Sequence, residues 1–160
     1  MQKISDVDLH QLTTKVAKFL LEKHWLLSSA ESCTGGWVAK CCTDIAGSST
    51  WFERGVVTYS NQSKQELLNV KADTLEQFGA VSEQIALEMA QGCLTQSSAN
   101  ISLSITGIAG PDGGSKEKPI GTVWIAWATN FSAKATLYHF SGNRDAVRRQ
   151  AVYTALSGII

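Results

Sequence analysis

The sequence predicts an α/β fold: a three-layer α/β/α sandwich built on a mixed, mostly parallel sheet of about five strands. Two observations indicate this architecture. Amphipathic segments with helical spacing alternate along the chain with short apolar or alternating segments that are typical of strands. The last two predicted strands follow each other with no helix between them, which requires at least one antiparallel pairing. With 160 residues, 44% of them hydrophobic, the chain is expected to form one domain over residues 1–160.

The first part of the chain is predicted to hold most of the helices. In order, we expect a helix over about Asp6–His24, a strand that begins at Trp25–Leu27, a helix around Val38 that ends at Ala46–Ser49, a strand over Gly55–Tyr59, and helices over about Gln62–Leu68, Ala72–Phe78 and Glu83–Gln96. The apolar side chains of the first helix recur at helical spacing and form one face. Ser60 and Ser82 belong to the residue types that cap helix N-termini, and Gly47 suits a helix C-terminus.

The second part is predicted to supply three strands and the last helix. Apolar and hydroxyl side chains alternate over Ile101–Thr106, and Thr122–Thr129 is a near-continuous apolar run that resembles a central strand. A further strand is expected over Ala133–Phe140, and Asn143 is expected to cap the C-terminal helix. The segment Gly107–Pro119 holds four glycines and two prolines, and a loop of this length in a compact domain usually signals function or mobility.

Composition excludes several classes of protein. Lys and Arg together number 14, as do Asp and Glu, so the net charge of zero indicates neither a nucleic-acid partner nor a membrane surface. The four cysteines lack the spacing of a zinc site and are expected to be reduced core thiols of a cytoplasmic protein. We therefore expect no metal and no cofactor. The N-terminus has no apolar signal core, and no run approaches the roughly 20 apolar residues that a membrane span needs.

The chain is organised around Ala30–Gly36, which reads AESCTGG and lies between a predicted strand and a predicted helix. Ser32 and Thr34 therefore stand at a helix N-terminus, where free N–H groups and the positive end of the helix dipole favour an anion or an oxyanion. A hydroxyl held there can serve as a nucleophile, and the alternative is that these residues only cap the helix. The turns after Ala30, Tyr59 and Thr106 are expected to form the rim of one pocket.

The base that would activate Ser32 cannot be a histidine, because no histidine falls in these turns. Lys64 is the candidate, since its place in the first turn of a helix and its burial in a cleft would both lower its pKa. The alternative is a solvated surface lysine. Tyr59 is expected to steer a proton or to hydrogen-bond the substrate. Cys33 is a competing nucleophile that we rank below Ser32, because no nearby histidine would form its thiolate.

Motifs along nearly the whole chain resemble those of the CinA C-terminal family. They are, in order, AESCTGG (30–36), AGSS (46–49), RG followed by TYSN (54–61), Lys64, GAVS (79–82), TGIAGPDGG (106–114), KP followed by GTV (118–123), and FSG (140–142) followed by Arg144 and Arg148. The resemblance implies an enzyme of pyridine nucleotide salvage that hydrolyses nicotinamide mononucleotide to nicotinate mononucleotide and ammonia. It also implies a dyad of Ser32 and Lys64, a small-molecule nucleotide as the substrate, and a homo-oligomer, expected to be a dimer.

The remaining site residues follow from the same chemistry. Backbone N–H groups near Thr34–Gly35 or in the Gly107 turn are expected to hold the oxyanion. The Gly107–Gly114 backbone and two arginines are expected to hold the 5′-phosphate, with surface salt bridges as the alternative role for the arginines. The substrate-binding residues expected are Thr34, Gly35, Gly36, Ser48, Thr106, Gly107, Ala109, Gly110, Arg144 and Arg148.

Two other functions stay open at this point. One is a catalytically silent nucleotide-binding module that presents a ligand to a partner, and the other is an amidase that uses Cys33 as its nucleophile. Turnover separates the silent module from either enzyme. The substitutions Ser32→Ala and Cys33→Ala separate the two enzymes.

Overall fold

A computed structural model describes residues 3–160. Its elements are α1 (Asp6–Lys23), β1 (Leu27–Glu31), α2 (Trp37–Thr43), the 3-10 turn η1 (Ser48–Thr50), β2 (Phe52–Val57), α3 (Asn61–Leu68), α4 (Ala72–Phe78), α5 (Glu83–Thr95), β3 (Ile101–Gly107), β4 (Thr122–Thr129), β5 (Ala133–His139) and α6 (Arg144–Ser157). Each predicted helix and strand has a counterpart. The end of α2 was predicted wrongly: the helix ends at Thr43 with Asp44 as its C-cap, and Gly47 instead begins η1 in the left-handed region. Strand β2 begins three residues before the predicted Gly55 and ends at Val57 rather than Tyr59.

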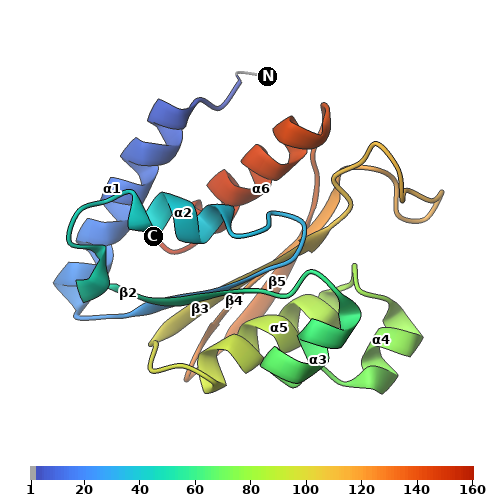
Figure 1. Cartoon of the computed structure of the whole chain (residues 1–160), viewed down its shortest axis with the longest axis horizontal. Helices are drawn as coiled ribbons and strands as arrows, with labels where there is room; N and C mark the ends of the chain where they lie inside the picture. Colours follow the sequence, from blue (N-terminus) through green and yellow to red (C-terminus); the bar gives the residue numbers. More distant parts are fainter. Residues whose placement is uncertain (1–2) are drawn as a thin grey trace.

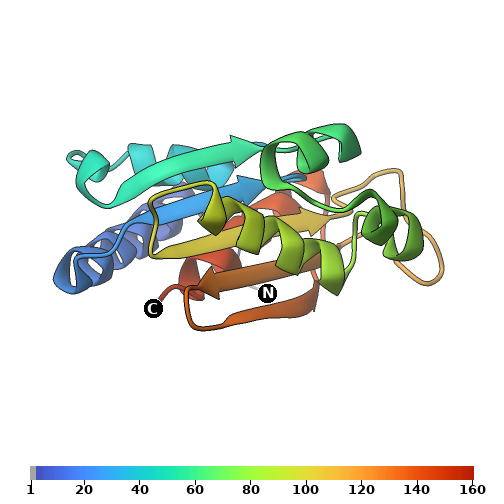
Figure 2. The ribbon, with the colours of Figure 1, turned by 90° about the horizontal axis from the view of Figure 1, so that it is seen from below.

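The five strands form one mixed sheet in the order β2-β1-β3-β4-β5. Strand β1 pairs in parallel with β2 and with β3. The β3–β4 and β4–β5 pairs are antiparallel, so β4 alone runs against the other four strands. Helices α1, α2 and α6 cover one face, and α3, α4 and α5 cover the other (Figures 1 and 2). The predicted three-layer α/β/α sandwich with a mixed sheet is confirmed.

The two faces of the sheet are buried by different chemistry. On the α1/α2/α6 face, large aliphatic side chains such as Leu103, Ile105 and Ile125 form the main apolar core. On the other face, β3 carries the hydroxyl side chains that its alternation predicted. Ser102 and Ser104 donate to the Ala90 and Ala86 carbonyls of α5, each at 2.6 Å. The hydroxyl-bearing face is therefore buried under a helix, and each hydroxyl is satisfied there.

Helix α5 also packs closely against the end of α3, and one glycine makes this possible. A Cβ atom built on Gly92 would lie 1.9 Å from the carbonyl oxygen of Leu68, the last residue of α3. Only a residue without a side chain fits there. This contact holds the end of α3 against α5, and α3 carries the candidate base Lys64.

The centre of the parallel half of the sheet is β1, so the turn that follows it is flanked by the ends of β2 and β3. The Thr58 N–H donates to the Glu31 carbonyl at 2.9 Å, and the Ser32 N–H donates to the Ile105 carbonyl at 3.0 Å. These bonds hold the start of the turn between its two neighbours. None of the helices within residues 3–160 is long and apolar enough to cross a membrane.

Candidate active site

Ser32 and Lys64 lie in contact, as predicted. The Lys64 Nζ atom is 3.2 Å from Ser32 Oγ and 2.9 Å from the Thr58 carbonyl oxygen. The Lys64 side chain is only 1% exposed. Its burial lowers the pKa of Lys64 below the ordinary lysine value, because desolvation disfavours the ammonium form. Within residues 3–160 no carboxylate forms an ion pair with Lys64. The pair therefore has the contact and the environment of a serine nucleophile with a lysine base.

Local sequence explains why Lys64 points inward. Ser60 begins α3 as a capping box: its hydroxyl accepts from the Ser63 N–H, and the Ser63 side chain accepts from the Ser60 N–H. Lys64 and Leu68 are the buried residues of α3, four positions apart and hence on one helix face. The face that packs on the sheet is therefore apolar at Leu68 and carries the candidate base one turn earlier. The surface-lysine alternative is wrong.

Cys33, the competing nucleophile, lies in apolar surroundings. It belongs to the core cluster on the α1/α2/α6 face and is 7% exposed. Burial raises the pKa of the Cys33 thiol to about 12, so the thiol stays protonated near neutral pH. A protonated, buried thiol is a poor nucleophile.

The start of α2 differs from the prediction, because the anion site expected there is already filled. The buried carboxylate of Glu31 accepts from the Val38 N–H at 2.9 Å and from the Ala39 N–H at 3.2 Å. It also accepts from the Thr34 hydroxyl at 2.7 Å. Thr34 is therefore not a simple helix cap: the N-cap residue is Gly36, which makes no side-chain cap bond.

Glu31 is a buried residue of the candidate site to which the sequence analysis assigned no role. Burial raises the pKa of Glu31 above the ordinary glutamate value, while the hydrogen bonds from the start of α2 act in the opposite direction. Its signal in the sequence was an acidic residue within a few positions of a helix N-terminus, where the dipole favours negative charge. That signal is weak, because strand alternation alone does not show which face of β1 is covered by α2.

The two predicted arginines have different surroundings. Arg148 donates from Nε to the Cys33 carbonyl and from a terminal nitrogen to the Thr34 carbonyl, each at 3.0 Å. Arg144 donates to the Gly110 carbonyl at 2.8 Å and lies 3.4 Å from the Tyr59 hydroxyl oxygen. Neither arginine forms a salt bridge within residues 3–160, so the alternative role of the arginines as surface salt-bridge residues is wrong. Only Arg144 lines the pocket in front of Ser32.

That pocket has a volume of about 320 Å³ and opens where β1, β2 and β3 end. The candidate residues that line it are Ser32, Cys33, Tyr59, Gly107, Ala109, Gly110 and Arg144. Lys64 lies behind Ser32, out of contact with solvent. The structure therefore brings together turns from three strand ends, as the sequence predicted, with the glycine-rich loop and Arg144.

Other predicted substrate-binding residues lie elsewhere. Gly35, Gly36, Thr34 and Arg148 line a different hollow of about 450 Å³. The Thr106 hydroxyl donates to the Ala80 carbonyl at 2.8 Å and so joins β3 to the segment before α5. Ser48 lies in η1, whose end is held at the opposite end of β1 from Ser32, because the Trp51 carbonyl accepts from the Leu27 N–H. The structure does not bring Ser48 to the site.

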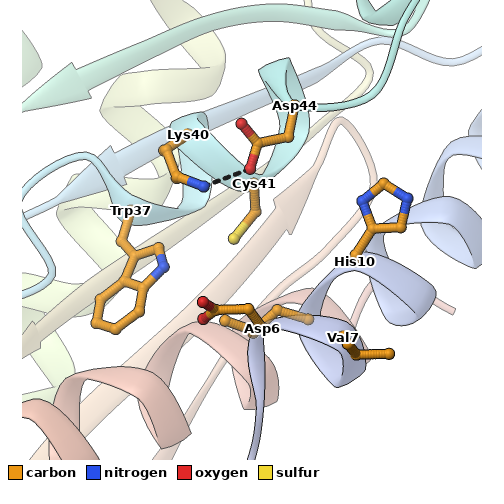
Figure 3. Close-up of a pocket in the computed structure, with 8 residues that line it drawn as sticks. Asp6, Val7, His10, Trp37, Lys40, Cys41 and Asp44 are labelled. Carbon is orange, nitrogen blue, oxygen red and sulfur yellow. Dashed lines mark hydrogen bonds and ion pairs between the residues drawn. The ribbon is translucent and has the colours of Figure 1, made fainter.

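A third hollow, of about 340 Å³, lies between α1 and α2 (Figure 3). Its polar groups include Lys40 and Asp44, which pair with each other, and His10. Burial raises the pKa of its one thiol, Cys41, to about 11. None of the predicted catalytic residues lines it. This hollow therefore offers no activated nucleophile. No group of three or more His, Cys, Asp or Glu residues within residues 3–160 is arranged to hold a metal ion.

Comparisons with known proteins identify the family. The family model for the CinA C-terminal domain matches residues 9–160. Nicotinamide-nucleotide amidohydrolase PncC of Escherichia coli K12 is 55% identical over 154 residues, which cover 96% of this chain and 93% of that protein. A CinA-like protein of Syntrophomonas wolfei is 48% identical over 97% of this chain, but the match covers only 37% of that longer protein.

Solved structures of similar proteins support the same family assignment. The crystal structure of the competence/damage inducible protein CihA from Agrobacterium tumefaciens superposes with a TM-score of 0.93 at 40% identity and covers 99% of this chain and 97% of that one. A CinA superfamily protein from Klebsiella pneumoniae superposes with a TM-score of 0.91 at 41% identity over 94% of each chain. This chain therefore belongs to the CinA C-terminal domain family.

Proposed function

We propose that this protein is a nicotinamide-nucleotide amidase, which hydrolyses the carboxamide of nicotinamide mononucleotide to yield nicotinate mononucleotide and ammonia in pyridine nucleotide salvage. The observation that carries the proposal is the contact between the Ser32 hydroxyl and the buried Lys64 amine at the rim of a pocket. The substrate is inferred from the E. coli relative, whose name states that activity. The pocket of about 320 Å³ is within the size range of small-molecule sites.

In the first half of the reaction, neutral Lys64 takes the proton of the Ser32 hydroxyl, and Oγ attacks the carboxamide carbon. The carbonyl oxygen becomes an oxyanion and needs hydrogen-bond donors. Two nearby N–H groups are already used, because that of Ser32 donates to Ile105 and that of Gly35 donates to the Ser32 carbonyl. The N–H groups of Cys33 and Thr34 donate to no other backbone group among residues 3–160, and we assign them as the donors.

The second half restores the enzyme. The Lys64 ammonium gives its proton to the departing amide nitrogen, so the C–N bond breaks and ammonia leaves an ester on Ser32. Water then attacks the ester carbon while Lys64 takes its proton. When the C–O bond to Ser32 breaks, that proton returns to Oγ. The product leaves as the carboxylic acid, and its remaining proton passes to solvent water to give the carboxylate. No metal or cofactor is required in these steps.

The phosphate of the substrate is assigned to Arg144, assisted by the Gly107–Gly114 backbone. Arg144 lies at the pocket and next to Tyr59. Its guanidinium uses one nitrogen for the Gly110 carbonyl, and its other N–H groups suit phosphate oxygens. Tyr59 is 64% exposed and joins the same wall, where its hydroxyl is placed to hydrogen-bond the substrate.

The test is incubation of the purified, EDTA-treated protein with nicotinamide mononucleotide, followed by assays for ammonia and nicotinate mononucleotide. We expect turnover by the wild-type protein, near-wild-type turnover by Cys33→Ala, and none by a folded Ser32→Ala protein. Binding of the nucleotide without turnover would favour the silent module. Loss of activity in Cys33→Ala alone would favour the thiol, against its burial and raised pKa.

A further inference from the structure

We propose that Arg148 and Glu31 are positioning residues that together hold the nucleophile turn and so aim the Thr34 N–H at the developing oxyanion. This inference rests on the proposed amidase function. It also replaces the phosphate-binding role that the sequence suggested for Arg148. Arg148 comes from α6, on the same face of the sheet as α2 (Figure 1).

Peptide geometry connects Arg148 to the oxyanion donor. The Cys33 carbonyl and the Thr34 N–H belong to one planar trans peptide group, in which the two bonds point in opposite directions. Arg148 donates to that carbonyl at 3.0 Å and therefore directs the Thr34 N–H away from itself. The second donor of the same planar guanidinium holds the next carbonyl, that of Thr34, at 3.0 Å. Rotation of the peptide between these residues would break the first of these bonds.

Glu31 holds the same turn from the interior. Its carboxylate accepts from the Thr34 hydroxyl and from two N–H groups at the start of α2. Thr34 is thus fixed through its side chain by Glu31 and through its main chain by Arg148. The residues that follow, Gly35 and Gly36, have φ of +60° and +96°, in the left-handed region. A turn of this kind has alternative backbone conformations open to it, and the two charged side chains select one.

The arrangement is not explained by stability alone. Glu31 is 1% exposed and forms no salt bridge within residues 3–160. Burial raises its pKa, which means that the ionised form is less stable in the folded protein than in water. A chain that needed only a helix cap has neutral residues that serve as well, such as Ser or Asn. A buried charge beside the nucleophile is consistent with a role in the geometry of the site.

The test compares kcat and KM for nicotinamide mononucleotide in Arg148→Met and Arg148→Lys. We expect Arg148→Met to lower kcat by about 10²-fold, the effect of losing one oxyanion donor, with KM changed by less than about threefold. Arg148→Lys should retain more turnover than Arg148→Met, because one ammonium can still reach one carbonyl. Arg149→Met is the matched control: Arg149 also lies over the Trp37 ring, but it pairs with Asp6 and not with the turn, so it should keep the wild-type kcat.

Thermal unfolding of each variant shows whether a loss of activity comes from lost positioning or from lost folding. A second pair of variants tests the hydrogen bond between Thr34 and Glu31. Thr34→Ser keeps the hydroxyl that Glu31 accepts and should retain more turnover than Thr34→Val, which lacks it. A rise in KM with unchanged kcat in Arg148→Met, together with a smaller preference for the nucleotide over nicotinamide riboside, would make Arg148 a phosphate anchor and overturn the inference. Absence of turnover in the wild-type protein would overturn the proposed function and this inference with it.

Discussion

Replacing Lys64 with Met should remove activity and change how stability depends on pH. Met fills much of the volume of the lysine stem but has no amine. We expect kcat/KM to fall by about 10²- to 10⁴-fold, the usual contribution of a general base. Because Lys64 is 1% exposed and burial lowers its pKa, the wild-type protein holds its ammonium at a cost that the variant does not have.

The size of this pH effect on stability follows from the linkage between proton binding and folding. Below the folded pKa of Lys64 both the folded and the unfolded chain carry the proton, and the full cost of burying the charge is present. Between that pKa and the ordinary value of 10.5 the unfolded chain binds more protons, so wild-type stability rises with pH relative to Lys64→Met. The slope there reaches about 1.4 kcal/mol per pH unit. For a chain of this length that corresponds to roughly 3–5 °C in Tm per pH unit.

The measurement is the difference in Tm between Lys64→Met and wild type at several pH values from 6 to 10. The hydrogen bonds that Met cannot make, to Ser32 Oγ and the Thr58 carbonyl, add a cost that is the same at every pH. We therefore expect the Tm of Lys64→Met relative to that of wild type to be highest at low pH and to decline as pH rises toward 10.5. Lys15→Met, on the exposed side of α1, controls for the loss of a surface charge. A pH-independent difference, or an active Lys64→Met protein, would refute the reasoning.

Three further predictions test the base, the phosphate site and the packing of α5. Lys64→Arg keeps the charge but cannot release a proton, so its kcat should fall almost as far as that of Lys64→Ala, and an unchanged kcat would exclude a base role. Arg144→Ala should raise KM for nicotinamide mononucleotide and reduce the preference over nicotinamide riboside; equal use of both substrates by the wild type would contradict the phosphate assignment. Gly92→Ala should destabilise the fold by about 1–3 kcal/mol in urea unfolding, because its Cβ would lie 1.9 Å from the Leu68 carbonyl oxygen, and an unchanged midpoint would show that the helices separate freely.

Local features of the fold could be predicted from the sequence because they depend on neighbouring residues. Ser60, Ser82 and Asn143 cap α3, α5 and α6 as expected, each by accepting from an N–H three residues later. The strands and their layer architecture followed from periodicity. The pairing of Ser32 with Lys64 could also be inferred, since both lie where a strand gives way to a helix and such ends meet at one edge of a parallel sheet.

The backbone of the nucleophile turn could not be predicted in this way. The sequence indicated free N–H groups at the start of α2, whereas the Glu31 carboxylate takes those of Val38 and Ala39. It assigned Arg148 to phosphate, whereas Arg148 holds two carbonyls of a turn that lies more than 110 residues earlier in the chain.

The sequence by itself thus determined the element types, the N-caps of α3, α5 and α6 and the candidate catalytic pair, since each of these depends on side-chain type and short-range spacing. Tertiary structure alone decided which N–H groups at the site stay free and which arginine faces the pocket. The physical reason is that a buried polar group bonds to whichever partner the fold brings within about 3 Å, and that partner can come from any part of the chain.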